Sequence, residues 1–398
     1  MHETYDSEIQ TLKIAVSGPP RLGIIGGGQL AKLTALAAAE LGCDVTVLER
    51  NSHSPAARVA ARSLVGDWND PSDLLTLAQQ VDVLSIENEF VDLDALAMIE
   101  RAGHRLVPGV KTLRLVQDKF IQKQTLSAAG LPVARFSLVY ESTDLEQLGV
   151  EFGWPLVLKS RRGGYDGKGN FTLRSTADIA AAWKALGGDS ENLYAEEFCP
   201  FEKELAVIVT RGADGHMASY PVVETVQHDH ICHLVKAPAA VSPETTKRAM
   251  EIARRAIESI DGIGSFGVEM FLTSAGEILV NELAPRVHNS GHFSIEACAC
   301  SQFENHVRAV LGWPLGSPDM TTPAAVMVNL LGDAKGSGVP LGLERALAVP
   351  GAHVHIYGKV MSGKGRKMGH ITVIGRTIAE AQTTAECAAR EIVFGQVL

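Results

Sequence analysis

The segment Arg161-Arg162-Gly163-Gly164-Tyr165-Asp166-Gly167-Lys168-Gly169-Asn170 places four glycines within seven residues. It follows the apolar run 155–158 and Lys159, which together are typical of a buried strand. Glycines leave backbone N–H groups free to curl around an anion, and such a loop could close over a bound nucleotide. The plain alternative is a glycine-rich hairpin without a ligand.

Two lysines on separate elements flank this loop. Lys119 stands at the start of a predicted helix, and Lys159 ends the predicted strand. Ammonium groups serve phosphate as point charges, so two of them could bind successive phosphates of a triphosphate. The loop and the lysines together indicate a nucleotide site.

Two acids stand inside apolar runs farther along the chain. Glu269 and Glu282 lie in the runs 267–272 and 278–283, which predict a hairpin turned at residues 274–276. A lone buried carboxylate is costly, so two of them on adjacent strands suggest a shared cation. Their hard oxygens suit Mg²⁺. The alternative is that both acids are paired with Arg286.

The segment 196–199 could form a hinge whose backbone reads adenine, with Glu204 taking the ribose hydroxyls. Taken alone, a solvated acidic turn explains it as well.

Earlier in the chain, Gly26, Gly28 and Ala31 follow the predicted strand 22–25 and match a dinucleotide-binding fingerprint, which Glu49 completes at the end of a second strand. The same turn occurs in α/β domains that bind no dinucleotide, so NAD binding stays open at this point.

Strands predicted at 22–25, 45–48 and 81–86 alternate with helical patterns, which indicates a parallel α/β unit. The later segments suggest antiparallel strands and a final helix from residue 378. We therefore expect a tail at 1–20, a Rossmann-like domain at 21–115, a central domain at 116–314 and a small β-rich domain at 315–398.

Composition limits the classes of function. The net charge of -10 argues against a nucleic-acid partner, because phosphate-backbone binding needs a basic face. No apolar run approaches the roughly 20 residues that span a bilayer. The six cysteines are scattered, as in a reduced protein, so the cytoplasm is the expected compartment.

Three stretches together resemble 5-(carboxyamino)imidazole ribonucleotide synthases of the ATP-grasp superfamily. They are Gly26-Gly27-Gly28-Gln29-Leu30, the loop 163–169, and Asn281-Glu282-Leu283-Ala284-Pro285-Arg286-Val287-His288-Asn289-Ser290-Gly291-His292. Residues 357–359 and 365–370 match as well, so the resemblance runs from about residue 22 to the C-terminus. It implies an α/β and α+β chain with an ATP-grasp fold, whose central lid covers about 137–197. It also implies ATP- and bicarbonate-dependent carboxylation of 5-aminoimidazole ribonucleotide through carboxyphosphate.

The resemblance also implies roles for individual residues. Nucleotide binding falls to Lys119, Lys159, Gly164, Tyr165, Asp166, Gly167, Lys168, Gly169, Asn170, Glu196, Glu197, Phe198, Cys199, Glu204, Gln227, Asn281 and Glu282. Mg²⁺ would be held by Glu269 and Glu282. Carboxylation falls to Arg286, His288, His292, Tyr165 and Asp166, with Asp166 as the proton acceptor. The ribonucleotide would contact Gly28, Gln29, Leu30, Glu87, Glu89, Lys359, Arg366 and Lys367, although the last three could be a solvated basic turn.

Other interpretations have less support. Strand alternation would place His228, His230 and Cys232 on one face, but this spacing is unlike a zinc framework. A formate-using ATP-grasp ligase would share the nucleotide site, and the segment 288–292 distinguishes the carboxylase from it. An NAD-dependent oxidoreductase rests on the first glycine turn alone, and a non-catalytic nucleotide-binding subunit would not need both lysines and both acids. The family resemblance suggests a homodimer.

Overall fold

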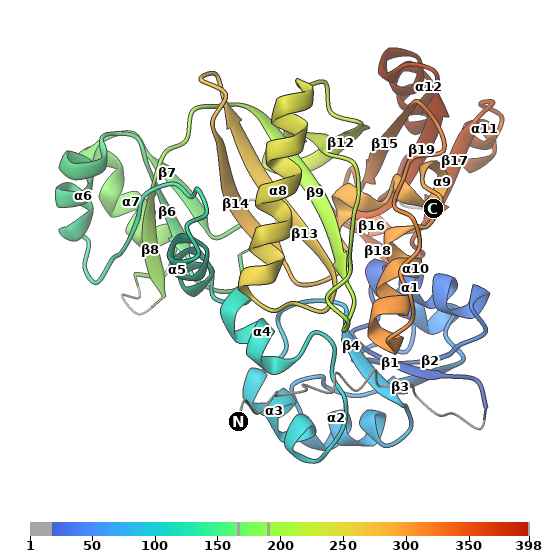
Figure 1. The fold of residues 1–398 in the computed structure, drawn as a ribbon. Helices are drawn as coiled ribbons and strands as arrows, with labels where there is room; N and C mark the ends of the chain where they lie inside the picture. The colour runs from blue at the N-terminus through green and yellow to red at the C-terminus, as the bar shows by residue number, and fades with distance from the viewer. Residues whose placement is uncertain (1–17, 165–167, 189–191, 397–398) are drawn as a thin grey trace, which may run out of the picture.

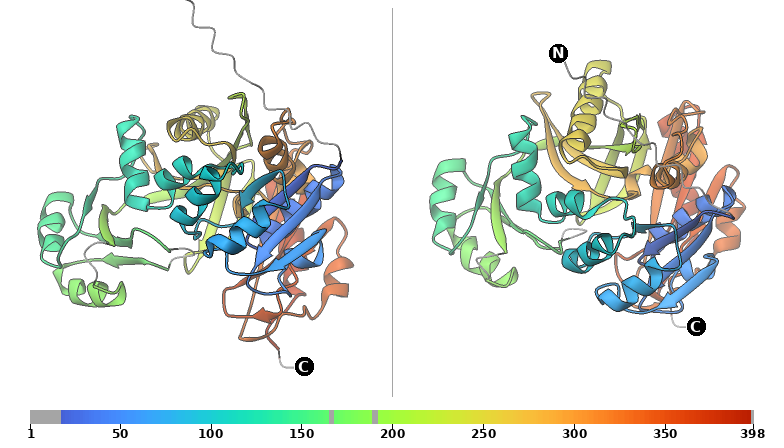
Figure 2. Two further views of the ribbon diagram at one scale, coloured as in Figure 1. Left: turned by 90° about the horizontal axis from the view of Figure 1, so that it is seen from below. Right: turned by 60° about the horizontal axis from the view of Figure 1, so that its bottom comes forward.

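A computed structural model describes residues 18–164, 168–188 and 192–396. Its ribbon shows an N-terminal α/β layer below a long curved sheet, with a small lid projecting to one side and the C-terminal elements on the other (Figure 1). Two further views show the lid standing away from the N-terminal layer (Figure 2).

The N-terminal layer is a parallel sheet in the order β3-β2-β1-β4. Its strands are β1 (Arg21–Ile25), β2 (Asp44–Glu49), β3 (Arg62–Val65) and β4 (Val83–Ile86), and its helices are α1 (Gln29–Glu40), α2 (Pro71–Ala78), α3 (Leu93–Arg101) and α4 (Val110–Val116). The strands and helix predicted from the apolar runs are confirmed. Strand β3 escaped prediction because it is short, at the sheet edge and largely exposed.

The lid is an antiparallel sheet in the order β5-β8-β6-β7, covered by two helices. It comprises β5 (Phe136–Leu138), α6 (Asp144–Phe152), β6 (Leu156–Ser160), β7 (Asn170–Leu173), α7 (Ile179–Ala185) and β8 (Leu193–Glu197). Helix α5 (Lys119–Ala128) leads into it, and the Asp118 carboxylate caps this helix by accepting from the N–H groups of Phe120 and Ile121.

The long sheet runs β14-β13-β9-β11-β12-β15-β19-β17, with β10 beside β9. Its strands are β9 (Phe201–Arg211), β10 (Met217–Ser219), β11 (Val223–His228), β12 (Ile231–Ala237), β13 (Gly264–Thr273), β14 (Ile278–Ala284), β15 (Ala324–Leu331), β17 (Ala352–Ile356) and β19 (Lys367–Gly375). Because β12 pairs with β15, the C-terminal strands extend the central sheet. The sequence did not reveal this continuity.

The remaining elements are short or cover this sheet. They are α8 (Pro243–Ser259), α9 (Ser294–Ala297), α10 (Gln302–Leu311), α11 (Leu343–Leu347), α12 (Ile378–Arg390), the strands β16 (Gly336–Ser337) and β18 (Met361–Ser362), and the 3₁₀ turns η1 (Ala56–Arg58), η2 (Thr176–Asp178) and η3 (Asn289–Gly291).

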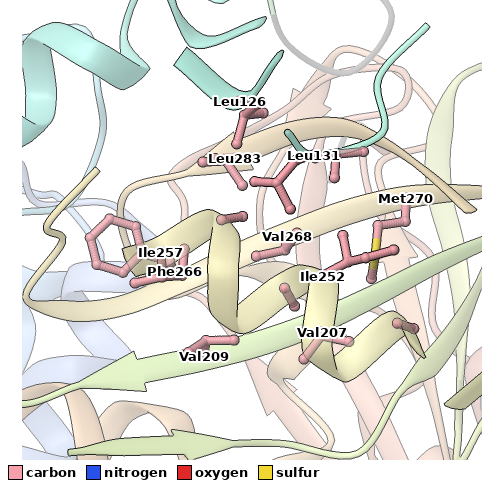
Figure 3. Close-up of a cluster of buried hydrophobic side chains, with 14 of the residues drawn as sticks. Leu126, Leu131, Val207, Val209, Ile252, Ile257, Phe266, Val268, Met270 and Leu283 are labelled. Atoms are coloured by element: carbon pink, nitrogen blue, oxygen red, sulfur yellow. The ribbon is translucent and has the colours of Figure 1, made fainter. Parts of the chain in front are cut away.

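Helix α8 packs on one face of β9 and β13 and closes the core shown in Figure 3. Val268 and Met270 of β13 point into this core and are almost fully buried. Each apolar side chain of this size contributes roughly 1.5–3 kcal/mol by burial. Successive side chains of a strand point to opposite faces. Burying Val268 and Met270 therefore turns Glu269 to the other face of the sheet.

The expected strand alternation across residues 228–233 is wrong. The chain reverses at Asp229 and His230, whose φ angles of 51° and 62° belong to a tight hairpin turn between β11 and β12. His228 and His233 instead face each other across the hairpin, with ring centroids 5.1 Å apart. In the part of the chain that the structure describes, no group of three His, Cys, Asp or Glu residues could hold a metal ion.

Candidate active site

Two carboxylates face each other on the surface of the sheet opposite α8. Glu269 and Glu282 are direct partners in the β13–β14 register, as the sequence predicts. Their side chains are 26% and 34% exposed, so solvent reaches both. Burial, reinforced by the charge of Glu282, raises the pKa of Glu269 to about 8. Mg²⁺, which often uses only one or two carboxylates together with phosphate oxygens, fits such a pair.

Lys119 lies directly against this pair. Its Nζ is 2.5 Å from Glu282 Oε2. Burial favours the neutral acid, but the nearby Lys119 charge and its hydrogen bond lower the pKa of Glu282. Lys119 begins α5, and its backbone N–H donates to the carbonyl of Arg161 at 2.8 Å, which ties the helix start to the base of the glycine-rich loop.

The glycine-rich loop borders the same pocket. Gly163, Gly164, Lys119 and Glu282 all line it. A Cβ on Gly164 would come within 2.9 Å of the Lys168 carbonyl oxygen, so the loop closes too tightly there for a side chain. Gly169 and Asn170 lead into β7. The expected contacts of Tyr165, Asp166 and Gly167 lie outside the described residues.

The second predicted lysine is held by an acid of the lid. Lys159 Nζ donates to Glu196 Oε2 at 2.9 Å and lies 3.5 Å from Asn281 Oδ1. Glu196 also contacts the Tyr194 hydroxyl at 3.0 Å and the Nζ of Lys123 at 3.3 Å. The Glu196 carboxylate therefore faces lysines, and only its backbone is left for the expected adenine contact. Lys123 was not among the predicted residues, although its spacing of four from Lys119 places both lysines on one side of α5.

The remaining adenine and ribose candidates divide between two faces. Glu197 alternates outward from Glu196 and pairs with Arg135 at 2.8 Å, so its side chain does not join the lysine cluster. Phe198 is exposed, and Cys199 is half-buried. Glu204 accepts a short hydrogen bond from Gln227, and burial raises the pKa of Glu204. The structure thus brings together Glu204 and Gln227, which were assigned to the nucleotide separately.

Arg286 does not pair with Glu269 or Glu282, so the paired-acid alternative is wrong. Its guanidinium binds Glu89 with two hydrogen bonds, Nε to Oε2 at 2.6 Å and NH2 to Oε1 at 3.0 Å. Glu89 follows β4, so the N-terminal layer positions a cation of the central domain. Glu89 also lines the pocket beside Lys119.

His288 contacts the acid pair from the other side. Its Nε2 lies 3.2 Å from Glu269 Oε1, while its Nδ1 accepts from the Ser290 N–H at 3.4 Å. Burial, with the Arg286 charge, lowers the pKa of His288 to about 3, which keeps the ring neutral. His292 does not reach the acids. It is fully buried, its Nδ1 is 3.2 Å from the Gln302 amide, and it packs on Phe303.

Of the three candidate basic residues near the C-terminus, two lie together and the third points elsewhere. Lys359 Nζ donates to the Lys367 carbonyl at 2.7 Å, which brings these two residues together. The positive charge of Lys367 acts on Glu269 and His288, so it belongs to the site. Arg366 is exposed and donates to the Met361 carbonyl at 2.7 Å.

The first glycine turn is already filled by acids. The Gly27 N–H donates to Glu49 Oε2 at 3.0 Å, and the Gly28 N–H donates to Glu87 Oε2 at 3.0 Å. The Leu30 N–H donates to the other Glu87 oxygen at 3.3 Å. A phosphate at this helix start would meet two carboxylates instead of free N–H groups. The geometry therefore argues against the dinucleotide interpretation.

Three family models match the chain. They are a ribonucleotide synthetase preATP-grasp domain over residues 20–117, an ATP-grasp domain over 124–303 and a phosphoribosylaminoimidazole carboxylase C-terminal domain over 325–384. None of the helices in the described ranges is long and apolar enough to cross a membrane.

Individual proteins match over most of the chain. The N5-carboxyaminoimidazole ribonucleotide synthase of Synechococcus elongatus is 42% identical, covering 96% of this chain and 96% of its own length. The chloroplastic phosphoribosylaminoimidazole carboxylase of Vigna aconitifolia is 43% identical over 91% of this chain, which spans only 65% of that longer protein. A crystal structure of N5-carboxyaminoimidazole synthase from Aspergillus clavatus, in complex with ADP and 5-aminoimidazole ribonucleotide, superposes on this chain with a TM-score of 0.86. The two sequences are 38% identical, and the superposition covers 94% of this chain and 99% of that chain.

Proposed function

The chain belongs to the N5-carboxyaminoimidazole ribonucleotide synthase family, and from this premise we propose that it carboxylates the amine of 5-aminoimidazole ribonucleotide. ATP and bicarbonate are the other substrates, and ADP, phosphate and N5-carboxyaminoimidazole ribonucleotide are the products. The observation that carries the proposal is that Glu282, Lys119 and the glycine-rich loop line one pocket, with Glu269 directly opposite Glu282 on the neighbouring strand.

Nucleotide binding uses groups from both sides of this pocket. Lys119 and Lys159 bind phosphates, and the loop from Gly164 to Asn170 covers them. Glu269 and Glu282 would hold Mg²⁺, which would supply positive charge beside the phosphates. Glu204 and Gln227 lie at the ribose end, and the backbone at 196–199 takes adenine.

Carboxylation proceeds in two transfers. A bicarbonate oxygen attacks the γ-phosphorus, the bond to ADP breaks, and carboxyphosphate forms. The amine of the ribonucleotide then attacks the carboxyl carbon, inorganic phosphate leaves, and the amine gives up a proton, with Asp166 as the acceptor. Arg286 and the His288 ring stabilise the anionic intermediate. Carboxyphosphate hydrolyses readily, so the lid has to exclude water while it exists.

The ribonucleotide occupies the side of the pocket away from the lid. Lys359 and Lys367 bind its 5′-phosphate, with Arg366 at the outer edge of the same turn. The first glycine turn, with Gln29 and Leu30, lines the imidazole end. Glu87 supports this turn from behind, and Glu89 holds Arg286 in place.

The finer organisation belongs to the same proposal. The domain boundaries at 21–115, 116–314 and 315–398 are close to the ranges of the three family models. We also propose a homodimer, which only the family resemblance supports. A cytoplasmic location is supported by six free cysteines, which are typical of a reducing compartment.

An isotope experiment tests the reaction. The protein is incubated with Mg-ATP, ¹⁸O-labelled bicarbonate and 5-aminoimidazole ribonucleotide, and the phosphate is analysed by mass spectrometry. Attack by a bicarbonate oxygen predicts one labelled oxygen in the phosphate, and only when the ribonucleotide is present. Unlabelled phosphate would contradict the carboxyphosphate route. Turnover supported by formate and glycinamide ribonucleotide would keep the nucleotide site and change the substrate.

A further inference from the structure

A buried lysine lies behind the phosphate-binding groups. Lys123 of α5 is only 2% exposed, and its Nζ donates to the Val280 carbonyl at 3.1 Å and lies 3.3 Å from Glu196 Oε1. Burial lowers the pKa of Lys123, and the facing carboxylate opposes this effect. Ammonium groups are rarely buried so completely unless they are paired. The position of Lys123 therefore calls for a role that involves Glu196.

Glu196 is shared between two ammonium groups. Lys123 approaches one carboxylate oxygen, and Lys159 Nζ donates to the other at 2.9 Å. Burial opposes ionisation, but the two lysines prevail and hold the pKa of Glu196 at about 2. The carboxylate is therefore ionised, and its charge is divided between the two lysines.

The charge balance of this cluster favours an anion at Lys159. Two ammonium groups and one carboxylate leave one positive charge in surplus. Lys159 is 12% exposed, whereas Lys123 is sealed in the interior, so an incoming phosphate can reach only Lys159. Without Lys123, Glu196 would neutralise Lys159 completely, and a phosphate would have to compete with that carboxylate.

We propose that Lys123 is a positioning residue for nucleotide binding, which neutralises Glu196 so that Lys159 keeps its positive charge for a phosphate. The same contacts join the lid, through Glu196 of β8, to the central sheet, through the carbonyl of Val280 in β14. Helix α5 lies between these two parts (Figure 1). The inference rests on the proposed function only in taking ATP as the ligand.

Titration calorimetry with a non-hydrolysable ATP analogue and Mg²⁺ tests this role. Lys123→Met should raise the dissociation constant about tenfold or more, because the surplus charge is lost in a site of low dielectric. Lys123→Arg keeps the charge and should stay within about threefold of the parent protein. Lys184→Met, which removes an exposed lysine on lid helix α7, is the matched control and should bind as the parent does.

The double variant Lys123→Met/Glu196→Gln separates charge balance from packing. It restores the surplus charge on Lys159 and buries no unpaired carboxylate, so it should fold and recover most of the lost affinity. Affinity equal to or weaker than that of Lys123→Met alone would overturn the proposal, and so would an unchanged affinity in Lys123→Met. The titration contains neither bicarbonate nor the ribonucleotide, so failure of the proposed carboxylation would leave its result intact.

Discussion

The molecule contains two glycine-rich turns that look alike in sequence and differ in what surrounds them. The first follows β1, and its N–H groups at Gly27 and Gly28 are bound by Glu49 and Glu87. The second follows β6 and lines a pocket with Lys119. Glycines allow a close approach to the backbone in both turns. Carboxylates of the protein occupy the N–H groups of the first turn, whereas an ammonium group lies beside the second, which we propose as the phosphate site.

The comparison shows that a glycine pattern predicts backbone geometry more safely than it predicts a ligand. In the first turn, a Cβ on Gly28 would fall 2.1 Å from Glu87 Oε1, so the glycine is required by a carboxylate of the protein itself. In the second turn, Gly163 has a φ of 74°, and a Cβ added there would meet no atom within 4 Å. The second turn therefore needs glycine at 163 for its backbone conformation, and at 164 for the close approach of the Lys168 carbonyl.

The largest effect is expected from the acid pair beside the second turn. Glu282→Gln removes a charge that holds Lys119 and half of the proposed Mg²⁺ site, so kcat/KM should fall about a thousandfold. Steady-state ADP release measures it. Glu277→Gln, an exposed change at the tip of the same hairpin, is the control. Activity within a few-fold of the parent protein would remove the acid pair from the mechanism.

A stability effect is expected where His306 of α10 contacts both β13 and β4, the strand that leads to Glu87. His306 Nδ1 accepts from the Ser265 N–H at 3.1 Å, and its Nε2 lies 3.0 Å from the hydroxyl of Ser85 on β4. Burial lowers the pKa of His306 to about 4. As pH falls from 6.5 towards 4, the unfolded chain binds a proton that the folded state refuses, so stability is lost in that window.

Urea unfolding at pH 7.5 and pH 4.5 checks this effect. The loss of unfolding free energy between these two pH values should be about 2–3 kcal/mol larger in the parent protein than in His306→Gln. Equal losses in both proteins would mean that the folded state accepts the proton on His306 as readily as the unfolded chain does.

The two turns can be compared directly by adding one methyl group to each. Gly28→Ala should lower the free energy of unfolding by roughly 1–3 kcal/mol, because the new Cβ collides with Glu87. Gly163→Ala should cost about 1 kcal/mol for its left-handed conformation. The KM for ATP should change more in Gly163→Ala than in Gly28→Ala. The reverse order of KM effects would exchange the roles of the two turns.

The smallest effect is expected for NADH. Because Glu49 and Glu87 occupy the N–H groups of the first turn, a fluorescence titration should show no saturable binding up to millimolar concentrations. Saturable binding that Mg-ATP does not displace would show that the first turn does accept a dinucleotide.

Much of the fold and part of the site could be predicted from local patterns. Alternation along 267–272 and 278–283 predicted that Glu269 and Glu282 meet across a hairpin, because the buried neighbours Val268 and Leu283 determine the opposite face. The position of Lys119 at a helix start was also predicted from the sequence. These inferences depend on periods of two or four residues, which a sequence displays.

What could not be predicted depends on contacts between distant segments. Glu87 fills a turn 59 residues away, and Glu89 binds Arg286 across 197 residues. Lys123 looks like an ordinary polar residue of an amphipathic helix until the lid places Glu196 above it. The turn at Asp229 and His230 was missed because neither residue is glycine, although both adopt positive φ.

We propose that the pocket between the second glycine-rich turn and the acid pair serves the carboxylation of 5-aminoimidazole ribonucleotide. ADP release from Mg-ATP, with bicarbonate and the ribonucleotide each added or left out, tests this most directly. Rapid release is expected only when both are present. Release at the same rate without the ribonucleotide, or no release under any of these conditions, would contradict it.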